Sequence, residues 1–239
     1  MRLRIFAGPN GSGKSTLKSI LKPEWLGIYI NPDELEAKIK KTNILDLQDF
    51  TIHAHEKETK TFFTSHPLTF KANLTDSIAK IVFKDNIIDF SHTIINSYIA
   101  SILSDFLRRK LVDSGKSLSF ETVMSSKDKI DFLAYAKEKG FKTYLYFIAT
   151  DDPQINIQRV ENRVYQGGHN VPKDKIINRY YKSLDNLYNA AKITYRSFIF
   201  DNSGDDRIFL AEVHKGKVTI KVDKVPVWFE KYFIQKANH

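Results

Sequence analysis

The chain has 239 residues, a formal net charge of +9 and no cysteine. The lack of cysteine excludes disulfides, thiolate metal ligands and cysteine nucleophiles. Hydrophobic residues make up 42% of the chain and charged residues 27%, as in a typical globular protein, and no apolar run reaches the roughly 18 residues of a membrane-spanning helix.

The N-terminal part of the chain alternates between strand and helix signals. Residues 3–7 form an apolar run that predicts a strand. Residues 8–13 form a glycine-rich loop, and residues 14–21 are predicted to form a helix that ends before Pro23. Residues 27–30 predict a second strand. A helix then begins at Pro32, which suits a first helical turn, while Asp33 and Glu34 suit the positive end of the helix dipole.

From about residue 41 to 115 the pattern is helical and polar, with a break at Pro67 and an amphipathic helix whose apolar positions run from Ile94 to Leu107. The rest of the chain returns to alternating strands and helices. It predicts strands at 117–123, 143–149 and 197–200, helices at 127–139, from 152 onward, at 174–191 and 227–233, and a β-hairpin at 208–213 and 218–222.

The loop after the first strand carries the motif Gly-x4-Gly-Lys-Ser. Its glycines let successive backbone N–H groups point at phosphate oxygens, its lysine reaches the β- and γ-phosphates, and its serine hydroxyl coordinates Mg²⁺. A strand before it and a helix after it complete the context of a P-loop. The residues that we expect to bind a nucleotide such as ATP are Gly8, Pro9, Asn10, Gly11, Ser12, Gly13, Lys14, Ser15 and Thr16, with Lys14 also catalytic and Ser15 the metal ligand.

The order of elements predicts an α/β P-loop NTPase fold. We expect a doubly wound, mainly parallel, five-stranded sheet with helices on both faces. No linker or repeat divides the chain, so residues 1–239 are predicted to form one domain, with a helical insertion at about 43–92 and a C-terminal hairpin and helix at about 206–239. Because a cleavable export signal would remove the P-loop, we expect a cytoplasmic protein.

The motifs of two large P-loop classes are missing. A GTPase would need a motif of the Asn-Lys-x-Asp kind, and an ABC subunit a Leu-Ser-Gly-Gly signature. Asp151 and Asp152 follow a buried strand and could imitate the acid of an ATPase, but Pro153 comes next, and helix capping explains these aspartates better. The pattern favours a small-molecule kinase, and it leaves the choice between ATP and GTP open.

Two acidic positions are candidates for the acceptor side of such a kinase. Asp33 follows the second strand, where a carboxylate can take the proton of the accepting hydroxyl, although it also suits a helix start. Glu121 and Thr122 end the third strand, where the carboxylate can reach Mg²⁺ through water or bind a sugar-like substrate. The alternative for Glu121 is a carboxylate that faces solvent.

Two arginines on one helix are candidates for a clamp on the transferring phosphoryl group. Arg159 and Arg163 stand four residues apart and therefore share a face of the helix. Their guanidinium groups can stabilise the charge that develops in the transition state. The alternative is a solvated face, with Glu161 nearby.

Several blocks in this order resemble the zeta-toxin-like P-loop kinases, in particular the branch often labelled predicted ABC-type ATPases. The resemblance covers residues 1 to about 205 except roughly 43–92. It is carried by 8–16, Asn-Pro-Asp-Glu at 31–34, Phe-Glu-Thr at 120–122, Arg-Val-Glu-Asn-Arg-Val at 159–164, Gly-Gly-His-Asn-Val-Pro at 167–172, the helix block 179–187 with its Ser-Leu-Asp-Asn-Leu, and Asp-Asn-Ser-Gly at 201–204.

The resemblance implies an ATP- and Mg²⁺-dependent kinase that phosphorylates a hydroxyl of a sugar nucleotide such as UDP-N-acetylglucosamine and that a small antitoxin protein inhibits. It places the base at Asp33, the substrate contacts at Glu121 and Thr122, and the phosphate clamp at Arg159 and Arg163. The role of His169 stays open between a ligand, a proton donor and a brace for its loop.

Two other functions stay open. One is a P-loop ATPase or regulatory nucleotide-binding module, and the other is a kinase that acts on a polynucleotide or RNA. Nucleic acid is not the partner that we expect, because the lysines are scattered and the densest basic cluster is the short run Arg108-Arg109-Lys110. No partner in a membrane is expected either.

Overall fold

The computed structural model describes residues 1–19, 21–168 and 170–238. The chain separates into two compact units. Unit 1 is Met1–Leu26 together with the chain from Ser119 onward, and unit 2 is Gly27–Leu118. That residues 1–239 act as one domain stays a prediction.

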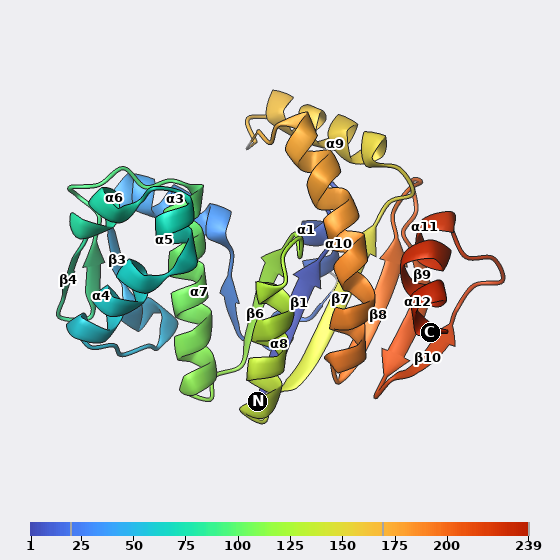
Figure 1. Cartoon of the computed structure of the whole chain (residues 1–239), viewed down its shortest axis with the longest axis horizontal. Coiled ribbons are helices and arrows are strands. Elements are labelled where there is room, and N and C mark those ends of the chain that lie inside the picture. The colour runs from blue at the N-terminus through green and yellow to red at the C-terminus, as the bar shows by residue number, and fades with distance from the viewer. Residues whose placement is uncertain (20, 169, 239) are drawn as a thin grey trace. The chain divides into compact units, whose positions relative to one another are not determined.

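Unit 1 is built on a sheet in which the P-loop strand β1 lies between β7 and β6 (Figure 1). Strand β1 is parallel to β7, and β7 is parallel to β8. The strands of this unit follow the order β10-β9-β8-β7-β1-β6, with bounds β1 (Arg2–Ala7), β6 (Leu118–Thr122), β7 (Lys142–Ala149), β8 (Arg196–Asp201), β9 (Ile208–His214) and β10 (Lys217–Ile220). The expected α/β architecture with a mostly parallel sheet is confirmed.

The central strands are mostly apolar and buried, although β1 also buries the charged Arg4. In β1, all residues from Leu3 to Ala7 are buried, and in β7 Leu145, Phe147 and Ile148 are fully enclosed. Near-continuous apolar runs are typical of parallel strands that are covered on both faces. The predicted C-terminal hairpin is present, and its first strand, β9, pairs antiparallel with β8, so the hairpin extends the sheet.

The helices of unit 1 begin and end where local signals require. Helix α9 starts at Pro153, and the side chain of Asp152 accepts a hydrogen bond from the N–H of Gln154, as the capping interpretation predicted. Helices α8 and α10 lie side by side against the sheet (Figure 1). The bounds are α1 (Lys14–Lys18), α2 (Pro23–Leu26), α8 (Asp128–Glu138), α9 (Pro153–Tyr165), α10 (Lys173–Ile193), α11 (Val227–Phe229), the short π-helix η2 (Glu230–Ile234) and α12 (Gln235–Ala237).

Unit 2 is mainly helical and also contains a small antiparallel sheet in the order β3-β5-β4. The expected helices of the insertion are present, and Pro67 separates two of them as predicted. The elements are β2 (Ile28–Ile30), α3 (Pro32–Thr42), β3 (Ile44–Asp46), the 3₁₀ turn η1 (Leu47–Phe50), α4 (Glu56–Ser65), α5 (Pro67–Lys71), α6 (Thr75–Ala79), β4 (Val82–Lys84), β5 (Ile87–Asp89) and α7 (Ser97–Asp113).

The small sheet was not part of the sequence prediction. Each of its strands has three residues, which is too short for an alternating pattern to stand out. One signal was available: Asp85 and Asn86 join β4 to β5 with φ values of 51° and 65°. Asp and Asn tolerate the left-handed region that the two central residues of a type I′ hairpin turn require.

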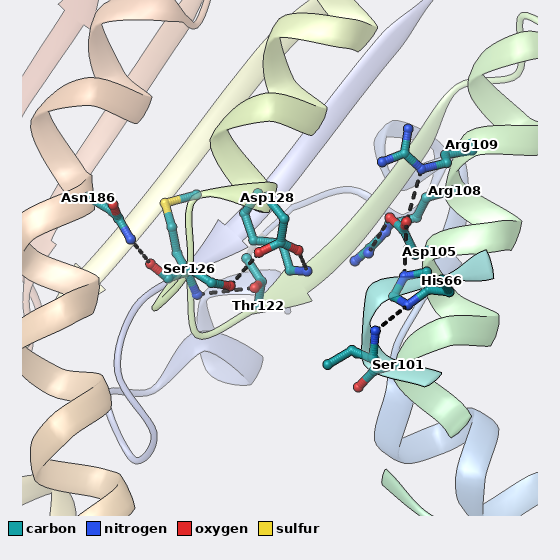
Figure 2. Close-up of polar contacts among 12 residues, drawn as sticks. His66, Ser101, Asp105, Arg108, Arg109, Thr122, Ser126, Asp128 and Asn186 are labelled. Atoms are coloured by element: carbon teal, nitrogen blue, oxygen red, sulfur yellow. Dashed lines mark hydrogen bonds and ion pairs between the residues drawn. The ribbon is translucent and has the colours of Figure 1, made fainter. Parts of the chain in front are cut away.

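A buried ionic cluster joins α5 and α7 inside unit 2 (Figure 2). Asp105 accepts hydrogen bonds from Arg108 at 3.0 Å and Arg109 at 2.9 Å, and its Oδ2 lies 3.6 Å from Nε2 of His66. Nδ1 of His66 in turn accepts a hydrogen bond from the N–H of Leu68 and caps α5. Burial opposes the ionisation of Asp105, but the contact with His66 and the two guanidinium charges outweigh it and hold the pKa of this carboxyl far below its ordinary range.

Among the described residues, no helix is both long and apolar enough to cross a lipid bilayer.

The Asp105 cluster gives a prediction about acid stability. Asp105→Asn keeps the shape of the side chain but removes the charge next to the buried Arg108, so we expect the free energy of unfolding at pH 7 to fall by roughly 3 kcal/mol. The ionised carboxylate stabilises the wild type above its unfolded-state pKa of about 3.9, and this contribution is lost as the pH falls below it. Urea unfolding should therefore give a difference between the two proteins that shrinks on acidification.

The matched control is Asp49→Asn, because Asp49 forms an ion pair of 2.6 Å with Lys38 but both side chains are about half exposed. Loss of such an exposed pair should cost less than about 1 kcal/mol. Equal losses for the two variants, or a difference that grows toward low pH, would contradict the role of the buried cluster.

Candidate functional site

The loop between β1 and α1 has a backbone conformation that requires glycine at two positions. Gly8 has a φ of 143°, and a Cβ atom there would lie 1.9 Å from the carbonyl oxygen of Ile148 on β7. Gly13 has a φ of 98°, and its Cβ would lie 2.6 Å from Nδ2 of Asn202. Only glycine fits at both positions, because the φ values are unfavourable for L-residues and the space is already filled. Helix α1 begins at Lys14 as predicted and ends at Lys18, before the expected residue 21.

Lys14 extends over this loop. Its ammonium donates hydrogen bonds to the carbonyl oxygens of Gly8 at 2.9 Å and Pro9 at 2.8 Å. The positive charge is therefore held against the first two carbonyl oxygens of the loop. Thr16 follows within the same turn, and its hydroxyl donates to the carbonyl of Gly13 at 2.7 Å.

Two of the predicted side chains meet next to the loop. The hydroxyl of Ser15 donates a hydrogen bond to Oε2 of Glu121 at 3.2 Å. Thr122 is adjacent, since its carbonyl accepts from the N–H of Gly8 at 3.3 Å, while its hydroxyl oxygen accepts from the N–H of Met124 at 3.1 Å. Ser15, Glu121 and Thr122 therefore lie at one edge of the P-loop, although they are far apart in the sequence.

The segment after Thr122 has a strained turn that α10 holds in place (Figure 2). Met124 has a φ of 55°, which is unusual for a bulky residue, and its side chain is buried. Asn186 of α10 donates a hydrogen bond from Nδ2 to the carbonyl of Met124 at 2.9 Å. Asn186 belongs to the Ser-Leu-Asp-Asn-Leu block, so this block braces the loop that follows Glu121.

Two asparagines that the sequence did not indicate as site residues donate hydrogen bonds to backbone carbonyls of the P-loop. Asn156 is fully buried in α9, and its Nδ2 donates to the carbonyl of Asn10 at 2.6 Å while its side-chain oxygen accepts from the hydroxyl of Thr150. Asn202 follows β8, and its Nδ2 donates to the carbonyl of Ser12 at 2.8 Å. The Asp-Asn-Ser-Gly block was a signal for Asn202, whereas no pattern distinguished Asn156.

The two arginines of α9 have different surroundings. Arg159 is half-buried, and its guanidinium donates to the carbonyl of Asn202 at 2.7 Å and to that of Gly204 at 3.4 Å. It thus holds the loop after β8. Arg163 is exposed one turn later, and Gly168 packs so closely on it that a Cβ there would lie 2.6 Å from Cγ of Arg163. A phosphate clamp by these two residues stays a prediction.

Asp33 belongs to unit 2, and its catalytic role also stays a prediction. It is exposed in the first turn of α3, and its N–H donates to the side chain of Asn31 at 2.9 Å. Asn31 is therefore the N-cap of this helix, so the carboxylate of Asp33 is not needed for capping. His169 lies outside the described residues.

Hard oxygen ligands for Mg²⁺ are present at the P-loop edge. The Ser15 hydroxyl and the Glu121 carboxylate already lie within hydrogen-bond distance of one another. Among the described residues, no group of three or more His, Cys, Asp or Glu side chains is placed to hold a metal by itself. This donor set fits Mg²⁺, which is usually held by one or two protein oxygens together with substrate phosphates and water.

Comparison with known proteins relates part of this chain to a described family. The family model described as Zeta toxin matches residues 97–214, which include Glu121, Thr122 and both arginines of α9 but not the P-loop. An uncharacterized protein of Haemophilus influenzae is 24% identical over 176 residues, which cover 74% of this chain and 90% of that protein.

The fold has counterparts among solved structures. The native AvrRxo1-ORF1:ORF2 complex aligns with a TM-score of 0.57 at 16% identity and covers 98% of this chain, and the same complex with ATP aligns with a TM-score of 0.54 at 18% identity over 92%. The chain spans 60–64% of the length of these AvrRxo1 chains. A structure from the PezAT toxin–antitoxin system of Streptococcus pneumoniae has a TM-score of 0.50 at 17% identity, with coverage of 98% of this chain and 79% of that one.

The Zeta toxin family model matches just under half of the chain, and this match and the shared fold confirm the resemblance to the zeta-toxin-like kinases that the sequence motifs carry.

Proposed function

We propose that this protein is an ATP- and Mg²⁺-dependent kinase that transfers the γ-phosphoryl group to a hydroxyl of a small, sugar-nucleotide-like acceptor. The observation that carries the proposal is the convergence of the Lys14 ammonium and the Ser15–Glu121 pair on the P-loop. A loop that presents backbone N–H groups together with a lysine binds the phosphates, and the neighbouring oxygens suit the cation that accompanies them.

The residues would share the reaction as follows. The acceptor oxygen forms a bond to the γ-phosphorus while the bond to the β,γ-bridging oxygen breaks, and ADP leaves. The proton of the hydroxyl passes to the carboxylate of Asp33. Lys14 exchanges its hydrogen bonds to loop carbonyls for phosphate oxygens and stabilises the charge that develops on them.

Mg²⁺ would be held by Ser15 directly and by Glu121 through water. When bound, it neutralises charge on the phosphate oxygens. Thr122 and Glu121 would also contact the acceptor, for which UDP-N-acetylglucosamine is the first candidate. A small antitoxin protein that covers the nucleotide site would be the natural inhibitor, as the toxin–antitoxin system named for the Streptococcus pneumoniae structure suggests.

The proposal is tested by incubating the protein with ATP labelled at the γ-phosphate, Mg²⁺ and a metabolite extract, with UDP-N-acetylglucosamine, DNA and RNA in separate reactions. We expect label on a small hydroxyl compound. ATP hydrolysis that only DNA or RNA stimulates, with no labelled small molecule, would instead indicate an ATPase that responds to nucleic acid.

Lys14→Ala should abolish phosphoryl transfer, because the variant lacks the charge that stabilises the transferring group. We expect kcat to fall by at least about 10²-fold, as for loss of a comparable electrostatic contact. The control is Lys18→Ala in the last turn of the same helix, which should keep its activity. Wild-type ATP consumption by Lys14→Ala would refute the nucleotide site.

The two arginines of α9 should differ in their effect on nucleotide binding. Arg163→Ala should lower kcat by about 10²-fold with little change in the Kd for ATP, because a clamp acts mainly in the transition state. Arg159→Ala should lower kcat and also weaken ATP binding, since it releases the loop that holds Asn202. Isothermal titration and steady-state rates separate the two outcomes, and normal turnover of Arg163→Ala would exclude it from the clamp.

Asp33→Asn should separate the acceptor chemistry from nucleotide binding. The N-cap Asn31 is unchanged, so the melting temperature should stay close to that of the wild type, and Mg²⁺–ATP should raise it equally in both proteins. Transfer to the acceptor should fall by roughly 10²- to 10⁴-fold, as for a lost general base. Full transfer activity would remove Asp33 from the mechanism, and lost stabilisation by ATP would place it at the nucleotide instead.

A further inference from the structure

The C-terminal helical turns of unit 1 are connected to the P-loop by a chain of buried hydrogen bonds. Trp228 of α11 is 3% exposed, and its indole N–H donates to Oδ2 of Asp201 at 2.7 Å. Asp201 is the last residue of β8 and is 5% exposed. A carboxylate buried to this extent keeps its position only when donors satisfy it.

Ser203 supplies the other donors to this carboxylate. Its backbone N–H donates to Oδ1 of Asp201 at 3.0 Å and its hydroxyl to Oδ2 at 2.9 Å. The same hydroxyl oxygen accepts a hydrogen bond from the N–H of Asp151 at 2.8 Å. The loop after β8 is therefore fixed on both sides of Asn202, by Asp201 before it and by Ser203 after it.

Asn202 carries the connection to the P-loop. Its backbone N–H donates to the carbonyl of Ala149 at 2.8 Å, and its side-chain amide donates to the carbonyl of Ser12 at 2.8 Å. The same amide nitrogen fills the space beside Gly13, where a Cβ would lie only 2.6 Å away. A shift of Asn202 would free the carbonyl of Ser12 to turn, and the N–H of Gly13 would turn with it because the two groups share one peptide plane.

We propose that Trp228, acting through Asp201 and Asn202, is a positioning residue that holds the P-loop in the conformation that binds nucleotide. The C-terminal turns, which lie beyond the part of the chain matched by the family model, thus become part of the nucleotide site. The inference rests on the proposed nucleotide binding at the P-loop. If only a fraction of the molecules holds the binding conformation, the apparent affinity falls by that fraction.

The experiment measures the Kd for Mg²⁺–ADP by isothermal titration on the 239-residue chain, together with the melting temperature without nucleotide. Trp228→Phe keeps an aromatic ring in the core but removes the indole N–H, and we expect its Kd to rise about three- to tenfold. Asn202→Ala, which removes the last link, should raise the Kd about tenfold. The double variant should bind like Asn202→Ala alone, because both changes interrupt the same path.

A control separates this effect from general loss of stability. Phe233 lies in the same C-terminal turns, is 1% exposed and stacks on Phe229. Phe233→Leu should lower the melting temperature without changing the Kd at a temperature where the protein is folded. If Trp228→Phe does not fold, Ser203→Ala removes another donor to Asp201 at a less buried position and should likewise raise the Kd.

The outcomes distinguish this proposal from the proposed function. If the wild type binds no nucleotide, both fail. The positioning role is refuted, while the nucleotide site stands, if Trp228→Phe and Ser203→Ala bind Mg²⁺–ADP with the Kd of the wild type. It is also refuted if the increase in Kd of the double variant Trp228→Phe/Asn202→Ala equals the product of the increases in the two single variants.

Discussion

A phosphate-binding loop must direct its N–H groups to one side, and its carbonyl groups then need donors on the other side. The rest of unit 1 is arranged around this requirement. Asn156 donates to the carbonyl of Asn10 and Asn202 to that of Ser12, both with side-chain amides. An unsatisfied carbonyl in this buried position would cost roughly 1–3 kcal/mol, enough to favour another loop conformation. The two asparagines therefore help to fix the conformation that the glycines of the loop permit.

The supports of these asparagines come from elements that are distant in the sequence. Asn156 is held through Thr150, whose carbonyl also accepts a hydrogen bond of 2.6 Å from the hydroxyl of the buried Tyr180. Burial raises the pKa of Tyr180, with smaller contributions from nearby acidic groups, so this hydroxyl remains a donor at physiological pH. Helix α10 thus braces the loop after β7 through Tyr180 and the loop after β6 through Asn186, which explains why its motif block carries both residue types.

Unit 2 shows a different use of buried polar groups. Asp105, with Arg108 and Arg109 of the 17-residue helix α7, contacts His66 at the N-cap of α5 and so links the two helices. Such a cluster adds little net stability compared with an apolar core. Removing one of its charges is nevertheless strongly destabilising, because the opposite charge is then left buried without its partner. Its geometry therefore specifies how α5 packs on α7 within this unit.

The sequence by itself determined the features that depend on neighbouring residues. The P-loop motif, the alternation of strands and helices, the break at Pro67 and the cap at Asp152 all follow from local rules of backbone conformation, and the structure agrees with them. The short sheet of unit 2 was missed because three-residue strands carry too little pattern.

The partners of the P-loop were decided only by tertiary structure: nothing in the sequence around Asn156, Asn202 or Trp228 says which carbonyl or carboxylate each will meet. Arg159 illustrates the same point, since its helical spacing from Arg163 was visible but its hydrogen bonds to the loop after β8 were not. Local signals specify which elements form, whereas the hydrogen bonds that shape the site join residues separated by up to 190 positions, and only folding brings them within reach.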